Sequence, residues 1–191
     1  MPHTVESLLP IIYHYYPRGM HCMSPLYGKS KQYQRLLALR KDAGTGERRA
    51  QWQAMVKRLR GRLLDCAFED RTLLYPPNHD TGYHVRIYMN PEDKSFARMI
   101  VGWVSAIIPC YIVYSSSGSV GRGEGPFKIR YTFTPEEQPI ADILSAEIEA
   151  TYGYERLPPE IGTVSIPDLC DPDRAFGNNN IYELLFIGHT W

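Results

Sequence analysis

Cysteine is scarce in this sequence, and no two cysteines lie close together. Cys22, Cys66, Cys110 and Cys170 are separated by 44, 44 and 60 positions in a chain of 191 residues. Zinc ribbons and thioredoxin-like redox sites need pairs such as C-x-x-C, so the spacing excludes both motif classes. A chain of this length buries enough surface to fold without cross-links. We therefore expect reduced thiols and a cytoplasmic protein.

Long hydrophobic runs are also missing. The longest apolar stretch, MIVGWVSAIIPCYIVY, spans residues 99–114 and is interrupted by Gly102, Ser105 and Pro109. It is shorter than the roughly 20 residues that a membrane-spanning helix needs, and its β-branched and aromatic content favours two buried strands. The first residues, MPHTVESLLPII, lack the basic segment of a secretory signal. The sequence predicts a soluble chain that does not contact a membrane.

Recognisable catalytic motifs are absent as well. The sequence contains neither a G-x-S-x-G elbow nor a G-K-[ST] phosphate loop, and the glycine-rich stretch 118–125 precedes a predicted strand instead of a helix. A calcium loop starting at Asp168 would need glycine at position six and glutamate at position twelve, and it has aspartate and asparagine there. His79 and His84 flank a turn and are expected to be exposed loop residues. We therefore predict no catalytic, cofactor-binding or metal-binding residues, and an enzyme of unrecognised class stays an alternative.

Charge is abundant and segregated, although the net charge of the chain is zero. Residues 29–64 contain eleven lysines and arginines against two acids, whereas residues 135–191 contain eleven acids against two arginines. A basic helical segment with Tyr33 and Trp52 between its cations could neutralise nucleic-acid phosphates. The neutral isoelectric point argues against that function, because nucleic-acid-binding domains are usually basic. The alternatives are binding of a charged protein partner and docking of the two segments on each other.

Hydrophobic periodicity predicts the elements. Apolar residues recur every three to four positions in 30–44 and 46–64, the period of amphipathic helices, and the short turn between them favours an αα-hairpin. Apolar and polar residues alternate in 83–89 and 127–133, the period of strands with one buried face. A first helix is expected around residues 5–13, with Thr4 as its N-cap. A further long helix begins either after Thr134, which can cap its N-terminus, or at Gln138 if Pro139 shifts the start.

Helices, then strands, then a helix are typical of an α+β domain. We predict a mainly antiparallel sheet of about four to six strands with helices packed on one side, because consecutive strands pair antiparallel by default. The whole chain, residues 1–191, is expected to form a single domain. Its parts are N-terminal helices (1–64), central strands (65–133) and a C-terminal helix with a tail (134–191).

The stretch YHYYPRGMHCMSP, residues 13–25, concentrates tyrosine, histidine, methionine and cysteine. A metal site built on His14, His21 and Cys22 is disfavoured because proline and glycine break any helix that would align them. The tyrosines could pack under the turn at Pro17. Alternatively, the aromatic, methionine and arginine side chains could form a protein interface, where these types are enriched.

Two stretches and the order of elements support a resemblance. YYPRG at 15–19, a tryptophan-bearing helix, a central apolar strand pair and the ending IPDL…FGNNNIYELLF at 166–186 are similar to immunity proteins of bacterial polymorphic-toxin systems, of the contact-dependent or type VI-like kind. The resemblance implies a non-catalytic protein that neutralises a cognate toxin by direct binding and occlusion. It supplies no catalytic residues.

The predicted partner is therefore a protein toxin, and a basic toxin domain such as a nuclease would suit the acidic part of the chain. Nucleic-acid binding through residues 29–64 is the third function considered, after an enzyme of unrecognised class. We expect two groups of partner-binding residues: an acidic group of Glu136, Glu137, Asp168, Asp171 and Asp173, and a second group of Tyr15, Tyr16 and Arg18.

Overall fold

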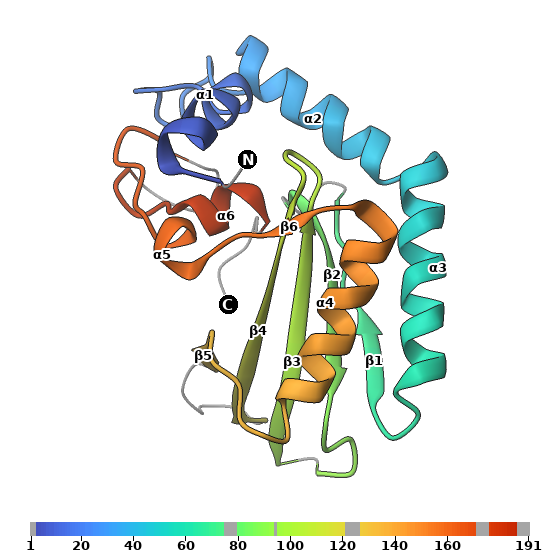
Figure 1. Cartoon of the computed structure of the whole chain (residues 1–191). Coiled ribbons are helices and arrows are strands. Elements are labelled where there is room, and N and C mark those ends of the chain that lie inside the picture. Colours follow the sequence, from blue (N-terminus) through green and yellow to red (C-terminus); the bar gives the residue numbers. More distant parts are fainter. Residues whose placement is uncertain (1–2, 75–79, 94, 121–126, 171–175, 187–191) are drawn as a thin grey trace.

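The computed structural model describes residues 3–74, 80–93, 95–120, 127–170 and 176–186. Helices and strands follow one another in the predicted order, helices first, then strands, then helices again (Figure 1). The elements are α1 (Val5–Tyr15), α2 (Lys31–Ala43), α3 (Gly46–Arg62), β1 (Ala67–Asp70), β2 (Gly82–Tyr88), β3 (Phe96–Ser105), β4 (Cys110–Ser119), β5 (Lys128–Arg130), α4 (Gln138–Tyr152), β6 (Glu155–Arg156), α5 (Pro159–Gly162) and α6 (Ile181–Leu185).

The sheet is an antiparallel meander, β1-β2-β3-β4-β5, to which the two-residue strand β6 adds one parallel pairing with β4. The apolar stretch 99–114 forms most of β3 and the first half of β4, in register with Val101 opposite Tyr114. The predicted α+β class with a mainly antiparallel sheet is therefore confirmed. The segment 127–133 contributes only the short strand β5.

Helices cover both faces of the sheet, whereas the sequence suggested one. Side chains alternate along β3, so Ile100 and Val104 point into one core while Val101 and Trp103 point into another. The first core packs under α3 and α4, and the second packs under α1 and α6. Figure 1 shows α3 and α4 side by side along the strands, with α1, α5 and α6 gathered at one end. Both faces of the sheet are apolar, so helices must pack on each of them to shield it from water.

Helices α2 and α3 do not form the predicted αα-hairpin. The Ser30 side chain accepts a hydrogen bond from the Tyr33 amide at the start of α2, and Gly44 ends it, as expected. However, Leu36 of α2 is buried in the core under α1, while Trp52 and Leu59 of α3 are buried in the core under α4. The two helices therefore diverge at the turn (Figure 1).

The oppositely charged parts of the chain meet where α3 packs on α4. Arg58 Nε and Arg62 Nη1 donate hydrogen bonds to the carboxylate of Glu147 at 3.0 and 2.9 Å. Arg49 of the same helix pairs with Asp70 of β1 at 2.9 Å. Some of the basic side chains of residues 29–64 are thus paired with acidic side chains of the same molecule. Among the helices that the structure describes, none is long and apolar enough to cross a bilayer.

Candidate functional site

The N-terminal loop after α1 lies on the segment 166–170, and the two segments are joined through Asp168. Arg18 Nε donates to Asp168 Oδ2 at 2.7 Å, and the Gly19 amide donates to the Asp168 carbonyl at 2.8 Å. Gly19 has a φ of +62°, a backbone conformation that suits glycine. The two stretches YYPRG and IPDL, 150 positions apart, therefore form one unit.

Tyrosine side chains attach this unit to the rest of the fold. Tyr13 OH donates to Asp168 Oδ1 at 3.2 Å, and the Arg18 guanidinium lies 4.3 Å from the centre of the Tyr13 ring. Partial burial and the neighbouring Asp168 carboxylate raise the pKa of Tyr13. Tyr16 is buried and donates to the carbonyl of Leu184 in α6 at 2.7 Å. Tyr16 is thus a core residue and offers a partner almost no surface, while Tyr15 is half-buried.

The outer side of the same loop presents large apolar side chains to solvent. Met23 is 79% exposed and Leu26 is 63% exposed, and Arg18 and His21 beside them are exposed as well. We call Arg18, His21, Met23 and Leu26 the loop surface. The loop is anchored beneath it by Tyr27, whose OH donates to the Cys170 carbonyl at 2.8 Å. Exposed apolar groups on an anchored loop form a preorganised contact surface.

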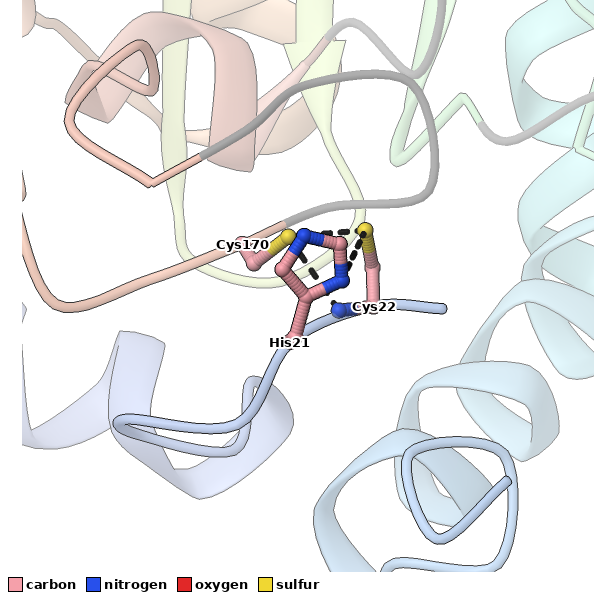
Figure 2. A group of neighbouring side chains, drawn as sticks. All are labelled: His21, Cys22 and Cys170. Atoms are coloured by element: carbon pink, nitrogen blue, oxygen red, sulfur yellow. Dashed lines mark hydrogen bonds between the residues drawn. The ribbon is translucent and has the colours of Figure 1, made fainter. Parts of the chain in front are cut away.

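A cluster of potential metal or redox ligands joins His21 of the loop surface to two cysteines, Cys22 and Cys170 (Figure 2). His21, Cys22 and Cys170 bring one ligand atom each within 4.8 Å of the others. The two Sγ atoms lie 2.7 Å apart, and the Cys22 amide donates to Cys170 Sγ at 3.2 Å. His21 Nδ1 lies 3.9 Å from Cys22 Sγ and accepts a hydrogen bond from the Met23 amide at 3.1 Å. Three such side chains can bind a metal ion, and the two thiols can form a disulfide.

The predicted acidic group is divided between two places. Glu136 is exposed beside the start of α4 and pairs with Arg98 at 2.8 Å. Asp168 belongs to the unit under the loop surface, near α1 and α6, and Figure 1 shows the start of α4 at the opposite end of the sheet. Asp171 and Asp173 lie outside the described residues. The acids that the structure describes therefore do not form one patch, and a role in partner binding stays a prediction for each exposed member.

Glu137 has a structural role. Its carboxylate accepts hydrogen bonds from Ser115 at 2.8 Å, from Arg130 at 2.7 Å and from the Thr134 amide at 2.8 Å. Burial acts to raise its pKa, but these hydrogen bonds and the Arg130 charge outweigh burial and leave the pKa lowered. Because the side chain is buried and fully engaged, Glu137 does not belong to an accessible partner surface.

A small apolar pocket lies on the sheet away from the loop surface. Arg86, Met99, Tyr114 and the half-exposed Phe127 are among the residues that line its volume of about 80 Å³. Pockets for small molecules usually measure about 300–1,000 Å³. This pocket is therefore a weaker candidate for a functional site than the loop surface.

Sequence reasoning found parts of this site and missed its centre. It selected Arg18 and Asp168 for separate groups, and it treated the cysteines as isolated because 148 positions separate Cys22 from Cys170. The only signal in the sequence for the His21–Cys22–Cys170 cluster was the stretch Met-His-Cys-Met at 20–23. No family model, no curated protein and no solved structure matches the chain significantly.

Proposed function

We propose that the protein is a non-catalytic binding protein that neutralises a cognate bacterial toxin by direct contact through the loop surface. The observation that supports this proposal most is the union of YYPRG with IPDL through Arg18, Gly19 and Asp168. The sequence resemblance to immunity proteins includes these two stretches, together with the tryptophan-bearing helix, the central apolar strand pair and the rest of the ending up to residue 186. Asp168 of the second stretch holds Arg18 and Gly19 of the first, so both stretches together support the loop surface.

The chemistry of the loop surface suits a protein partner. Methionine, arginine and aromatic side chains are enriched in protein interfaces, and Met23 and Leu26 expose apolar area that water solvates poorly. The anchoring contacts of Tyr27 and Asp168 reduce the entropy that the loop would lose on binding. A toxin bound here would be blocked by occlusion, which requires no reacting group on this chain.

The proposed partner surface differs from the acidic one expected from charge alone. Glu137 is buried, and Asp168 is engaged by Arg18 and Tyr13. Lys29 is exposed nearby, and the Arg18 side chain is 63% exposed although it pairs with Asp168, so these two cations instead favour a toxin whose contact region is neutral or acidic.

The proposal is tested by co-expressing the chain with the toxin encoded next to its gene and measuring growth. Wild type should restore growth and should bind an inactivated form of that toxin in a pull-down. The double variant Met23→Asp/Leu26→Asp should lose rescue and bind at least about 100-fold more weakly, because charge replaces two central apolar contacts.

Leu64→Asp is the matched control, since Leu64 is 82% exposed at the end of α3. It should rescue growth as well as wild type. If wild type neither binds nor protects, the immunity function is wrong. If the double variant protects as wild type does, the loop surface is wrong. Retention of the chain on DNA that salt abolishes would favour the nucleic-acid alternative.

A further inference from the structure

We propose that Cys22 and Cys170 are a disulfide-forming pair, oxidised by thiol–disulfide exchange with a low-molecular-weight disulfide such as oxidised glutathione. Neither cysteine forms a disulfide in the structure. The sequence predicted unpaired, reduced cysteines, so the pair is a property that the fold creates. It is independent of the proposed toxin partner.

The distance between the two sulfur atoms supports the proposal. Unbonded carbon atoms pack best at about 3.5–4.0 Å, and sulfur is larger than carbon. The Sγ atoms of Cys22 and Cys170 lie at 2.7 Å, closer than unbonded sulfurs normally approach. The Cys22 amide also points at Cys170 Sγ from 3.2 Å, which holds the two backbones together. The fold has thus brought the thiols almost to bonding distance.

A shared metal ion fits the same geometry less well. Two thiolates bound to one tetrahedral zinc ion at about 2.3 Å each are about 3.8 Å apart, so the sulfurs would have to separate by about 1 Å from the 2.7 Å of the structure. His21 Nδ1 is engaged by the Met23 amide, which leaves only Nε2 of this ring for a metal. Disulfide formation needs only the two thiols already in contact.

Accessibility sets the order of the reaction. Cys22 is partly exposed and Cys170 is buried, so Cys22 is the thiol that a small disulfide can reach. The Cys22 thiolate attacks one sulfur of oxidised glutathione, which forms a mixed disulfide and releases one glutathione. The Cys170 thiolate then attacks Cys22 Sγ and releases the second glutathione. The protein loses two electrons and two protons, and the two glutathione thiols receive them.

The bond would join the N-terminal loop to the segment before α6, across 148 positions. Closing so long a loop restricts the unfolded chain strongly. It would also fix the backbone from which His21 and Met23 of the loop surface project. Oxidation is therefore expected to stabilise the fold and to hold this surface in one conformation.

The experiment equilibrates the full chain with oxidised glutathione and then alkylates the remaining thiols in denaturant. Intact mass should show two alkylated cysteines per oxidised chain, against four in the reduced chain. Peptide mapping should find Cys22 linked to Cys170. The melting temperature should rise by about 5–15 °C on oxidation and fall back with dithiothreitol.

The control variant is Cys66→Ser, which removes a partly exposed thiol outside the pair. It should oxidise as wild type does, while Cys22→Ser and Cys170→Ser should show neither the linked peptide nor the melting shift. Four alkylated thiols in wild type after equilibration, or glutathione adducts without the internal bond, would overturn the proposal. So would stoichiometric zinc binding that protects both thiols and is lost in both pair variants, which would assign a metal site. None of these outcomes depends on a toxin.

Discussion

His84 lies inside the fold, although its place beside a turn suggested an exposed residue. It is buried on β2, and its imidazole stacks on Trp103 with ring centres 3.8 Å apart. Burial lowers its pKa well below the ordinary value, and the charges of Arg86 and Arg71 act in the same direction. The folded protein therefore holds His84 neutral under conditions in which an exposed histidine is charged.

This residue predicts how stability depends on pH. In the unfolded chain His84 binds a proton below a pKa of about 6.5, while in the folded protein it stays neutral to much lower pH. The unfolded state then binds more protons, so stability is full above about pH 6.5 and falls by up to about 1.4 kcal/mol for each pH unit below it. Urea unfolding at pH 7.5, 6.5 and 5.5 measures this loss.

His84→Gln is the comparison, because glutamine keeps a polar side chain and does not titrate. The variant should be less stable at pH 7.5, yet it should lose less stability than wild type between pH 6.5 and 5.5. Equal losses in the two proteins over this interval would show that His84 does not control the pH dependence.

At the scale of elements, α4 approaches the sheet closely because β3 carries a glycine. A Cβ placed on Gly102 would lie 2.8 Å from Leu144 Cδ2, and Leu144 is fully buried. The glycine that interrupts the apolar stretch 99–114 thus leaves the space into which α4 packs. Its function is visible only when α4 is in place.

Gly102→Val is expected to destabilise the protein by about 1–3 kcal/mol, because the added carbons must displace α4 or distort Leu144. Gly61→Ala is the control: Gly61 lies in α3 with open space around its Cα, and alanine should stabilise the helix by about 0.5–1 kcal/mol. Denaturant unfolding of the two variants measures both effects. Equal stability of wild type and Gly102→Val would contradict the close approach of α4.

At the scale of the whole molecule, the basic and acidic segments are partly complementary to each other. Glu147 of α4 is mostly shielded from solvent between Arg58 and Arg62 of α3, each about half-exposed. The two arginines lower the pKa of Glu147 despite its partial burial, which acts to raise it. The segregated charges therefore contribute to the packing of α3 on α4. Because they are partly used within the molecule, they are weaker evidence for a charged ligand than the sequence alone suggested.

Glu147→Lys should cost about 1–2 kcal/mol, because it places three cations together, and added salt should recover part of the loss. Asp65→Lys changes the net charge equally at an exposed site just after α3 and should alter stability by less than about 0.5 kcal/mol. Urea unfolding at low and high sodium chloride distinguishes them. If the two variants lose the same stability, net charge is responsible and the pairing of Glu147 is not.

The sequence by itself determined what depends on neighbouring residues. Thr4 and Ser30 cap α1 and α2, as capping is a local property. Alternation in 83–89 and the apolar, β-branched run in 99–114 predicted the central strands, which are also local patterns. The antiparallel meander followed from strands consecutive in the chain. The start of α4 stayed open between Thr134 and Gln138, and the structure places it at Gln138.

Tertiary structure decided everything that depends on distant residues. It covered both faces of the sheet, buried Tyr16, His84 and Glu137, and separated Glu136, beside the start of α4, from Asp168, beside Arg18. It also brought Cys22 to Cys170 and Arg18 to Asp168. Hydrophobic burial selects which segments pack together from the whole chain, and no local pattern records which partners 150 positions apart that packing will join.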